Sequence, residues 1–179
     1  SSARSTLSHS PMGCASKSCL TAVPLESMTT STPCQSIDQP GWLELREQLW
    51  PHCPQAQHVR EMTAFLAAPQ HYAQFIQYDA AAQAIGLVEV ALRHDYVNGT
   101  RSSPVAYLEG IYVVPRARRQ GVARALVADA ERWAADAGCT EFASDALLDN
   151  TQSQAMHAAL GFSESMRVVF FRKSIVPSR

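Results

Sequence analysis

A chain of 179 residues is the length of a single domain, and a hydrophobic content of 46% is enough to form a core. Its 15 basic and 16 acidic residues give a net charge of -1, so the composition does not indicate a nucleic-acid-binding surface. No apolar run approaches the length that spans a membrane. We therefore expect neither nucleic acid nor a membrane among the partners of this protein.

The beginning of the chain differs in composition from the rest. Residues 1–36 are dense in Ser, Thr and Pro and poor in large apolar side chains, which is typical of a disordered extension. We predict a disordered Ser/Thr-rich extension over residues 1–27 and a single folded domain over residues 28–179. The extension lacks the continuous apolar region of a signal peptide, so we expect a cytoplasmic protein.

The first half of the folded part predicts two helices followed by two strands. Apolar residues recur at helical spacing over Trp42–Trp50, where Pro51 ends the pattern, and again over Val59–Leu66. Strands are expected at Tyr72–Tyr78 and Ala84–Leu92, joined by a polar turn.

The second half alternates strands and helices. Its expected elements are a strand at Val105–Val114, a helix at Val122–Ala137, a strand at Thr140–Ser144, a helix from Asn150 or Thr151 to Leu160, and a strand at Val168–Lys173. Together with a first strand before the first helix, this order predicts an α/β (α+β) fold with a mixed sheet and helices on both faces.

The most informative segment is the loop Arg116–Gly121, which joins a strand directly to a helix. The first N–H groups of a helix have no acceptor within the helix and carry partial positive charge, so they suit an anionic phosphate. Gly121 lets the backbone approach a ligand, and Arg118, Arg119 and Arg124 add positive charge. An ordinary connection with solvated arginines is an equal alternative. Neither the dinucleotide motif GxGxxG nor the P-loop motif is present, which argues against both ligand classes.

These residues resemble a known family. Arg118-x-x-Gly121-x-Ala123 resembles the pyrophosphate motif [QR]-x-x-G-x-[GA] of the GNAT superfamily of acetyl-CoA-dependent N-acetyltransferases. Five further segments are similar to bacterial aminoglycoside 6'-N-acetyltransferases. They are Arg93-His-Asp-Tyr-Val-Asn-Gly99, Ser102-Ser-Pro-Val105, Leu108-Glu-Gly-Ile111, Ala143-Ser-Asp145 and Leu160-Gly-Phe162. The resemblance runs from Trp42 to Lys173.

The resemblance implies a fold and an activity. The fold would be GNAT-like, with a mostly antiparallel central sheet and a splayed parallel strand pair, so residues 28–179 would form one acetyltransferase domain. The activity would be transfer of acetyl from acetyl-CoA to the 6'-amine of aminoglycoside antibiotics by direct attack in a ternary complex, causing resistance. Family members are commonly homodimers, with the loop around Tyr96 near the partner. No histidine or cysteine spacing suggests a metal site, so no metal is expected.

The resemblance also implies residues that bind the cofactor. Strand-like hydrogen bonds from the backbone of Ile111, Tyr112 and Val113 would hold the pantetheine arm. The pyrophosphate would lie on Arg119, Gln120, Gly121, Val122, Ala123 and Arg124. Asn150 matches an asparagine that reaches the CoA arm, although it is equally suited to cap a helix.

Two carboxylates are the candidate catalytic residues. Glu109 lies within an apolar strand, where a carboxylate is costly unless it meets a cation or water. Gly110 beside it suggests a bulge. The alternative for Glu109 is a pair with an internal arginine. Asp145 follows the neighbouring strand, where resembling enzymes place an aspartate that contacts the substrate and acts as a base; a turn or cap aspartate is its alternative.

The expected substrate-binding residues are Trp50, Tyr96, Glu109 and Asp145, because a polycation is bound by carboxylates and aromatic walls. Trp50 in the core and Tyr96 on a loop surface are the alternatives. The chain departs from the family at Cys53, where a histidine is usual, and at Met166, which replaces an acidic residue. A third departure is His157, where many members carry a tyrosine that protonates the CoA thiolate, so His157 or water would be the general acid.

Two other functions stay open at this stage. A GNAT enzyme for another amine, such as a polyamine or a protein N-terminus, would keep the same cofactor motif. A non-catalytic acetyl-CoA sensor would keep the loop at Gly121 without turnover.

Overall fold

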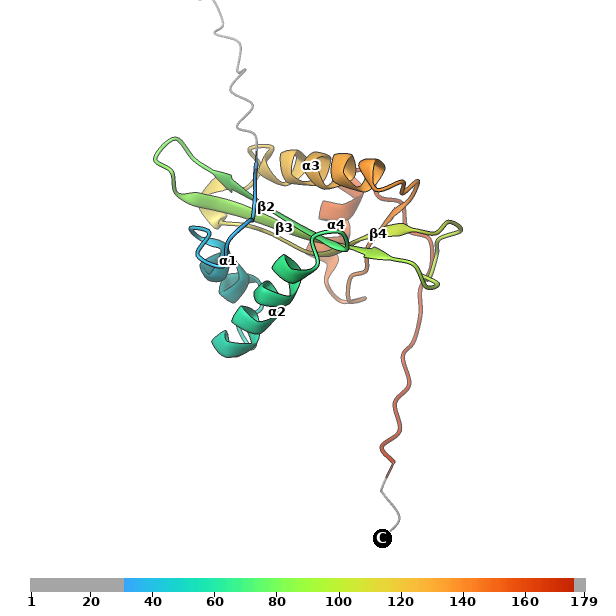
Figure 1. Cartoon of the computed structure of the whole chain (residues 1–179). Coiled ribbons are helices and arrows are strands. Elements are labelled where there is room, and N and C mark those ends of the chain that lie inside the picture. Colours follow the sequence, from blue (N-terminus) through green and yellow to red (C-terminus); the bar gives the residue numbers. More distant parts are fainter. Residues whose placement is uncertain (1–30, 176–179) are drawn as a thin grey trace, which may run out of the picture.

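The computed structural model describes residues 31–175, and its central element is a five-stranded sheet in the order β1-β2-β3-β4-β5 (Figure 1). The strands are β1 (Thr32–Pro33), β2 (Tyr72–Tyr78), β3 (Ala84–Arg93), β4 (Val105–Val113) and β5 (Phe142–Ala143). The helices are α1 (Trp42–Leu49), α2 (Gln55–Ala67), α3 (Val122–Asp136) and α4 (Thr151–Ala159), with a 3-10 turn at Pro115–Ala117. The predicted extension, residues 1–27, lies outside the described residues.

The sheet is antiparallel from β1 to β4, and only the pair β4 and β5 is parallel. This confirms the predicted mixed, mostly antiparallel sheet. The β2 strand and the start of β3 match the sequence prediction, because their alternating and apolar runs are bounded by polar turns.

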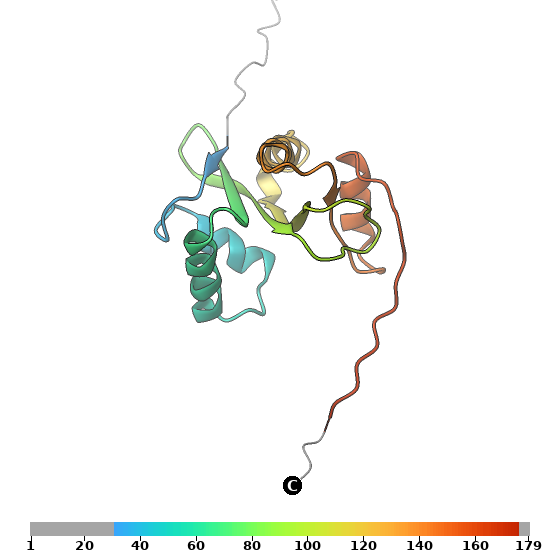
Figure 2. The same ribbon diagram turned by 45° about the vertical axis from the view of Figure 1, so that its right-hand side comes forward.

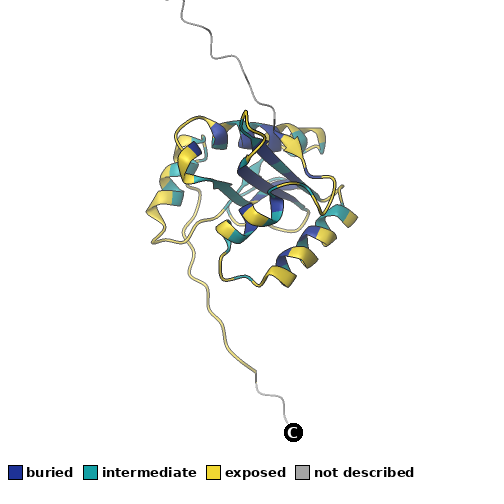
Figure 3. Ribbon diagram, turned by 90° about the vertical axis from the view of Figure 1, so that its left-hand side faces the viewer, coloured by how far each residue is buried: buried dark blue, intermediate teal, exposed yellow. Residues whose placement is uncertain are grey.

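Helices pack on both faces of the sheet, as the sequence predicted (Figure 2). On one face, α3 packs Leu126 and Ala130 against Val88, Val90 and Leu108. On the other face, α1 and α2 form a second core that consists of Cys34, Trp42, Leu45, Met62, Ile76 and Leu87. Because β2 and β3 are covered on both sides, seven of the ten β3 residues and three of the seven β2 residues are buried (Figure 3).

A β-bulge interrupts the pairing of β3 with β4. Glu89 faces Gly110 and Val90 faces Leu108, so Glu109 is an extra residue without a partner in β3. The bulge that Gly110 suggested in the sequence is therefore present, and it lies at the candidate catalytic residue.

The parallel pair β4 and β5 separates soon after it forms. Pairing joins Ala106 to Phe142 and Tyr107 to Ala143, and beyond it the Ser144 hydroxyl donates to the Leu108 carbonyl at 3.3 Å. From Glu109 onward, the edge of β4 that faces away from β3 has no strand partner within residues 31–175. This is the splayed strand pair that the resemblance implied.

The last predicted strand is not formed. Val168–Lys173 alternates and is rich in β-branched and aromatic residues, but the chain from residue 163 to 175 has no strand pairing and extends away from the domain (Figures 1 and 2). A strand needs a neighbour for its backbone N–H and C=O groups, and the described part of this chain places none beside the segment. The prediction was wrong for the isolated chain because local propensity does not supply that neighbour.

Candidate active site

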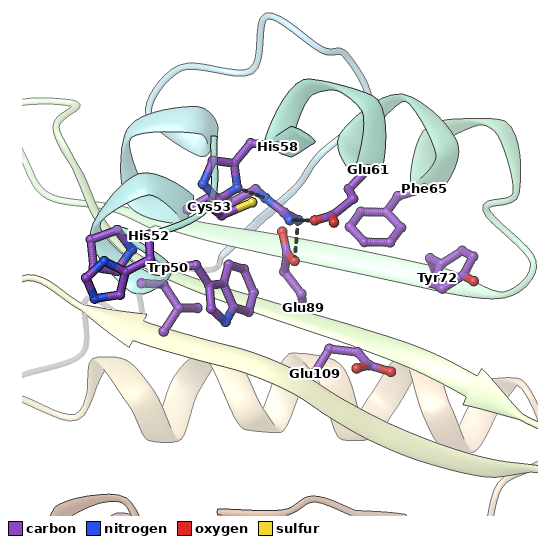
Figure 4. A pocket seen from close by; sticks show the side chains of 12 residues that line it. Trp50, His52, Cys53, His58, Glu61, Phe65, Tyr72, Glu89 and Glu109 are labelled. Atoms are coloured by element: carbon purple, nitrogen blue, oxygen red, sulfur yellow. Dashed lines mark hydrogen bonds and ion pairs between the residues drawn. The ribbon is translucent and has the colours of Figure 1, made fainter. Parts of the chain in front are cut away.

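A cavity of about 850 Å³ lies between α1, α2 and the sheet, next to the bulge (Figure 4). Its volume is within the range of roughly 300–1,000 Å³ that small-molecule sites occupy. The lining residues are Arg46, Leu49, Trp50, Pro51, His52, Cys53, His58, Glu61, Phe65, Tyr72, Glu89 and Glu109. Two predicted site residues, Trp50 and Glu109, therefore share one cavity, and the lining set contains neither Asp145 nor Tyr96.

Gly110 makes room for the Trp50 side chain in the cavity wall. A Cβ at this position would come within 2.6 Å of Trp50 Cζ2 and 2.8 Å of Leu49 Cδ2, closer than real Cβ contacts allow. The glycine therefore lets the indole lie against β4. Trp50 is thus a wall residue of the cavity as well as part of the packing.

Glu109 and Asp145 belong to one chain of polar contacts. Arg93 Nη2 donates to Glu109 Oε1 at 2.8 Å, and the Arg93 guanidinium stacks over the Tyr107 ring at 3.4 Å. The Tyr107 hydroxyl donates to Asp145 Oδ1 at 2.7 Å. Glu109 does pair with an arginine, but Arg93 is not the internal arginine of the alternative, because the side chains are 37% exposed for Arg93 and 35% for Glu109. The pair therefore does not bury Glu109 away from a ligand.

Tyr107 is held as a hydrogen-bond donor. Burial, and then the bond to Asp145 and its negative charge, raise the pKa of Tyr107 above its usual range. The raised pKa favours the protonated phenol, which donates to one Asp145 oxygen. Asp145 itself is exposed, which leaves its other oxygen available to a ligand.

A buried ionic cluster beneath the cavity escaped the sequence prediction. Arg46 donates to Glu89 Oε2 at 2.6 Å, to Glu61, and to His58 Nδ1 at 3.3 Å. Trp42 Nε1 donates to the other Glu89 oxygen at 2.9 Å. Burial raises the pKa of Glu89, while the charge of Arg46 and these hydrogen bonds oppose that rise.

Two signals in the sequence could have identified this cluster. Arg46 lies on the apolar stripe of α1, one turn after Trp42, and Glu89 lies in the apolar run of β3. A cation and an anion that both fall at core positions of neighbouring elements are expected to pair.

The loop before α3 is shaped as the phosphate hypothesis requires. Gly121 is the N-cap of α3 with φ of 85°, and Arg119 also has a positive φ of 62°. A Cβ at Gly121 would meet nothing within 4 Å, and the first bond of the helix joins Ala125 N–H to Gly121 O at 3.0 Å. The N–H groups of Val122, Ala123 and Arg124 therefore precede that bond at an open helix start, and an anionic pyrophosphate fits there.

The basic residues of this loop differ in their contacts. Arg118 Nε donates to the Val113 carbonyl at 3.0 Å and therefore braces the loop against β4. Arg116 pairs with Asp79 at 2.9 Å, and Gln120 Nε2 donates to the Arg116 carbonyl at 2.8 Å. Arg124 reaches the Ala159 carbonyl at 3.3 Å, which links α3 to the end of α4.

The backbone residues predicted to hold the pantetheine lie where β4 has separated from β5. Ile111, Tyr112 and Val113 pair with β3 on one side only, so hydrogen-bonding groups directed to the other side have no strand partner in β5. The bond from Arg118 already engages the Val113 carbonyl. Asn150 is the N-cap of α4 and accepts from Ser153 N–H at 3.0 Å, so its predicted capping role is present.

His157 lies close to the point where β4 and β5 separate. Its Nδ1 lies 2.8 Å from the Ser153 carbonyl, and its Nε2 lies 2.9 Å from Ser144 Oγ. Since a carbonyl can only accept, Nδ1 carries a proton and donates it to Ser153, while Nε2 is in hydrogen-bond contact with the Ser144 hydroxyl. Ser144 connects the imidazole to the edge of β4.

Three remaining positions lie apart or at the margin. Tyr96 is 76% exposed on the loop between β3 and β4, outside the cavity lining. Met166 is exposed on the unpaired segment after residue 162. Cys53 lines the cavity. Within residues 31–175, the His, Cys, Asp and Glu side chains form no group suited to a metal ion.

Comparison with known proteins places this geometry in a family. The model of the acetyltransferase (GNAT) family matches residues 40–162. An aminoglycoside N(6')-acetyltransferase type 1 of Acinetobacter genomosp. 13 is 53% identical over 134 residues, which cover 75% of this chain and 90% of that protein. The protein of the same name from Serratia marcescens is 49% identical over 142 residues, covering 79% and 97%.

Solved structures agree with these matches. The apo crystal structure of aminoglycoside 6'-N-acetyltransferase AAC(6')-IG from Acinetobacter haemolyticus has a TM-score of 0.76 at 48% identity and covers 81% of this chain and 98% of its own. The structure of AAC(6')-Iy with the bisubstrate analog CoA-S-monomethyl-acetylneamine has a TM-score of 0.74 at 44% identity, covering 81% and 99%. The chain therefore belongs to the GNAT family of acetyltransferases and uses acetyl-CoA as its acetyl donor.

Proposed function

We propose that this enzyme transfers the acetyl group of acetyl-CoA to the 6'-amine of aminoglycoside antibiotics and thereby confers resistance to them. The observation that carries the proposal is the position of the carboxylate-lined cavity, which reaches the bulge at Glu109 where β4 leaves β5. A polycationic acceptor bound there would lie beside the strand edge available to the cofactor. The relatives, 41–53% identical and bearing this activity in their names, support the same acceptor.

For acetyl transfer, the protein must align the acceptor amine with the thioester and remove a proton from the amine. Acetyl-CoA supplies an activated thioester, which the amine attacks directly in a ternary complex. An alkyl amine is only about 0.1% neutral at pH 7, so a carboxylate near it must accept a proton. We assign this work to Glu109 and Asp145, which the contacts through Arg93 and Tyr107 hold in place.

The remaining residues have positioning roles in this proposal. Trp50 and Tyr96 bind the acceptor, and the backbone of Ile111, Tyr112 and Val113 binds the pantetheine. The helix start from Arg119 to Arg124 binds the pyrophosphate, and Asn150 contacts the CoA arm as well as capping α4. His157 or water returns a proton to the CoA thiolate, and the contacts of His157 with Ser153 and Ser144 hold its ring where β4 and β5 separate.

Release of the CoA thiol with a panel of acceptors tests the proposed function. We expect turnover with kanamycin, tobramycin and amikacin, which carry a free 6'-amine, and none with spermidine or a peptide. Mass spectrometry of the product would locate the acetyl group at the 6'-nitrogen. Turnover with only spermidine or the peptide would show that the acceptor is not an aminoglycoside. CoA binding without turnover would indicate a non-catalytic sensor.

We further propose that the enzyme is a homodimer joined through residues 163–175. This segment exposes large apolar side chains, among them Val169 at 77%, Phe170 at 83% and Phe171 at 93%. Its sequence favours a strand, and β5 is an edge strand of the described sheet. Pairing with the sheet edge of a second copy would cover the apolar side chains and satisfy the backbone.

The loop that carries Tyr96 adjoins this segment. A Cβ at Gly99 would collide with Ser165, so the loop and the start of the segment are in close contact. In a dimer formed through residues 163–175, Tyr96 would therefore lie near the partner.

Phe171→Asp tests the dimer. Its side chain is almost fully exposed in the single chain, so the substitution should leave the monomer folded while burying a charge in the dimer interface. We expect light scattering to show two chains for the wild type and one for the variant. Val59→Asp, on the exposed side of α2, is the control and should stay dimeric. A monomeric wild type would contradict the proposal.

The cytoplasm is the proposed location, because acetyl-CoA is available there. None of the helices between residues 31 and 175 has the length and apolarity required to cross a membrane.

A further inference from the structure

Arg46 is an unexpected residue beneath a cavity proposed to bind a polycation. It is 2% exposed and lines the cavity from α1. Its guanidinium contacts Glu61 and Glu89 and lies 4.9 Å from the centre of the Trp50 ring and 5.3 Å from that of Phe65. One side chain therefore connects both carboxylates and both aromatic walls on this side of the cavity.

The carboxylates of the cavity differ in what they can offer to a ligand. Glu89 is 2% exposed, and Trp42 and Arg46 occupy its two oxygens. Glu61 is 37% exposed on α2, although its oxygens also receive bonds from Arg46 and from Gln57 Nε2, the latter at 2.7 Å. A carboxylate oxygen has two lone pairs, so each Glu61 oxygen can accept one more hydrogen bond. Glu61 is thus available to a ligand where Glu89 is not.

The charges of the cavity favour a cation despite Arg46. Three carboxylates and one guanidinium line it, and Arg93 pairs with Glu109 from outside the lining, so the acidic groups outnumber the basic ones by three to two. Figure 4 shows Glu61 and Glu89 directed toward each other on the α2 side, while Glu109 lies apart from them on β4. The two partly exposed carboxylates, Glu61 and Glu109, therefore line the cavity from different elements, α2 and β4.

We propose that Glu61 is a further acceptor-binding residue and that Arg46 is the positioning residue that holds it. Glu61 binds an ammonium group of the acceptor away from the reacting amine, which lies nearer to Glu109. Arg46 fixes the rotamer of Glu61 and stacks against Trp50. The Trp50 ring and the Glu61 carboxylate are thereby held in a fixed arrangement. The inference rests on the proposed aminoglycoside acceptor.

Glu61→Gln is the first test. The amide keeps the shape of the side chain and an oxygen for Arg46, and it removes the charge and the oxygen that accepts from Gln57 Nε2. We expect the KM for kanamycin to rise about tenfold, with kcat and the KM for acetyl-CoA changed less than twofold. Glu131→Gln, an exposed residue of α3 away from the cavity, makes the same change of charge and should leave all three constants unaltered.

Arg46→Lys tests the positioning role. Lysine keeps the charge but cannot bridge Glu61, Glu89 and His58 at once. We expect a higher KM for kanamycin in this variant too, and the double variant with Glu61→Gln should resemble the more affected single variant. Such non-additivity marks two residues that act through one contact. A loss of stability alone would not produce it.

Two outcomes would overturn the inference. One is a Glu61→Gln enzyme whose kinetic constants match those of Glu131→Gln, which would make Glu61 a structural partner of Arg46 only. The other is a rise in the acetyl-CoA KM equal to that for kanamycin. The proposed function fails separately, since it requires that the wild-type enzyme acetylate kanamycin at all.

Discussion

Replacing Asp145 by Asn is expected to lower kcat for kanamycin by on the order of 10²-fold or more, within the range that a proton-accepting group contributes. Asparagine still offers an oxygen to the Tyr107 hydroxyl, which lies 2.7 Å from Asp145 Oδ1, so the local geometry should persist. The negative charge and the basic oxygen are lost. Single-turnover kinetics at saturating kanamycin and acetyl-CoA would measure the chemical step directly.

Tyr107→Phe is the matched control for Asp145→Asn. It removes the hydrogen bond and leaves the carboxylate, so we expect a fall in kcat of less than about tenfold, the effect of one hydrogen bond of about 1 kcal/mol. Acetyl-CoA affinity should be unchanged in both variants, because the pyrophosphate loop is separate from this pair. Equal rates in the wild type and Asp145→Asn would remove Asp145 from the mechanism.

Replacing Gly110 by Ala is expected to raise the KM for kanamycin at least tenfold. The added methyl group would lie 2.6 Å from Trp50 Cζ2 and 2.7 Å from Trp50 Cη2, so the indole must move into the cavity. Overpacking of this kind also costs about 1–3 kcal/mol of stability. Acceptor kinetics and thermal unfolding would measure the two effects.

Gly138→Ala separates these effects. Gly138 has φ of 83° and follows α3, and a Cβ there would meet nothing within 4 Å. Alanine in this backbone conformation costs roughly 1–2 kcal/mol, without any contact to the cavity. We expect a lower melting temperature and an unchanged KM. If Gly110→Ala behaved in the same way, Trp50 would not shape the acceptor site.

Much of the fold follows from local pattern. The stripe of α3 and the runs of β2 and β3 identify their own elements, because burial repeats at the period of each element. Gly121 and Gly138 mark the two ends of α3 through the positive φ that each position requires. The segment from 163 to 175 shows the limit of such patterns, since a strand also depends on which other backbone lies beside it.

The sequence reveals a site residue where a single charged side chain interrupts an apolar element. It does not reveal a pair of opposite charges that lie in different elements and neutralise each other in the fold. Glu109 is visible as a charge in an apolar strand. Arg46 and Glu89 are each such an interruption, but 43 positions separate them along the chain, and only the packing of α1 on β3 reveals the pair. The size of the cavity also depends on that packing. The sequence therefore predicts Trp50 as a binding residue but does not predict the cavity that its indole lines.

The extra residue in β4 changes which residues of the strand lie on the same face of the sheet. In a regular strand, neighbouring residues face opposite sides of the sheet. A charged residue and a glycine on the same face would therefore be two positions apart. Because the register shifts at Glu109, Glu109 lines the cavity and Gly110 faces Trp50 in its wall, while Leu108 and Ile111 stay with the core under α3. Two consecutive residues thus control different properties of the cavity, since Glu109 supplies a charge and Gly110 sets how closely Trp50 approaches β4.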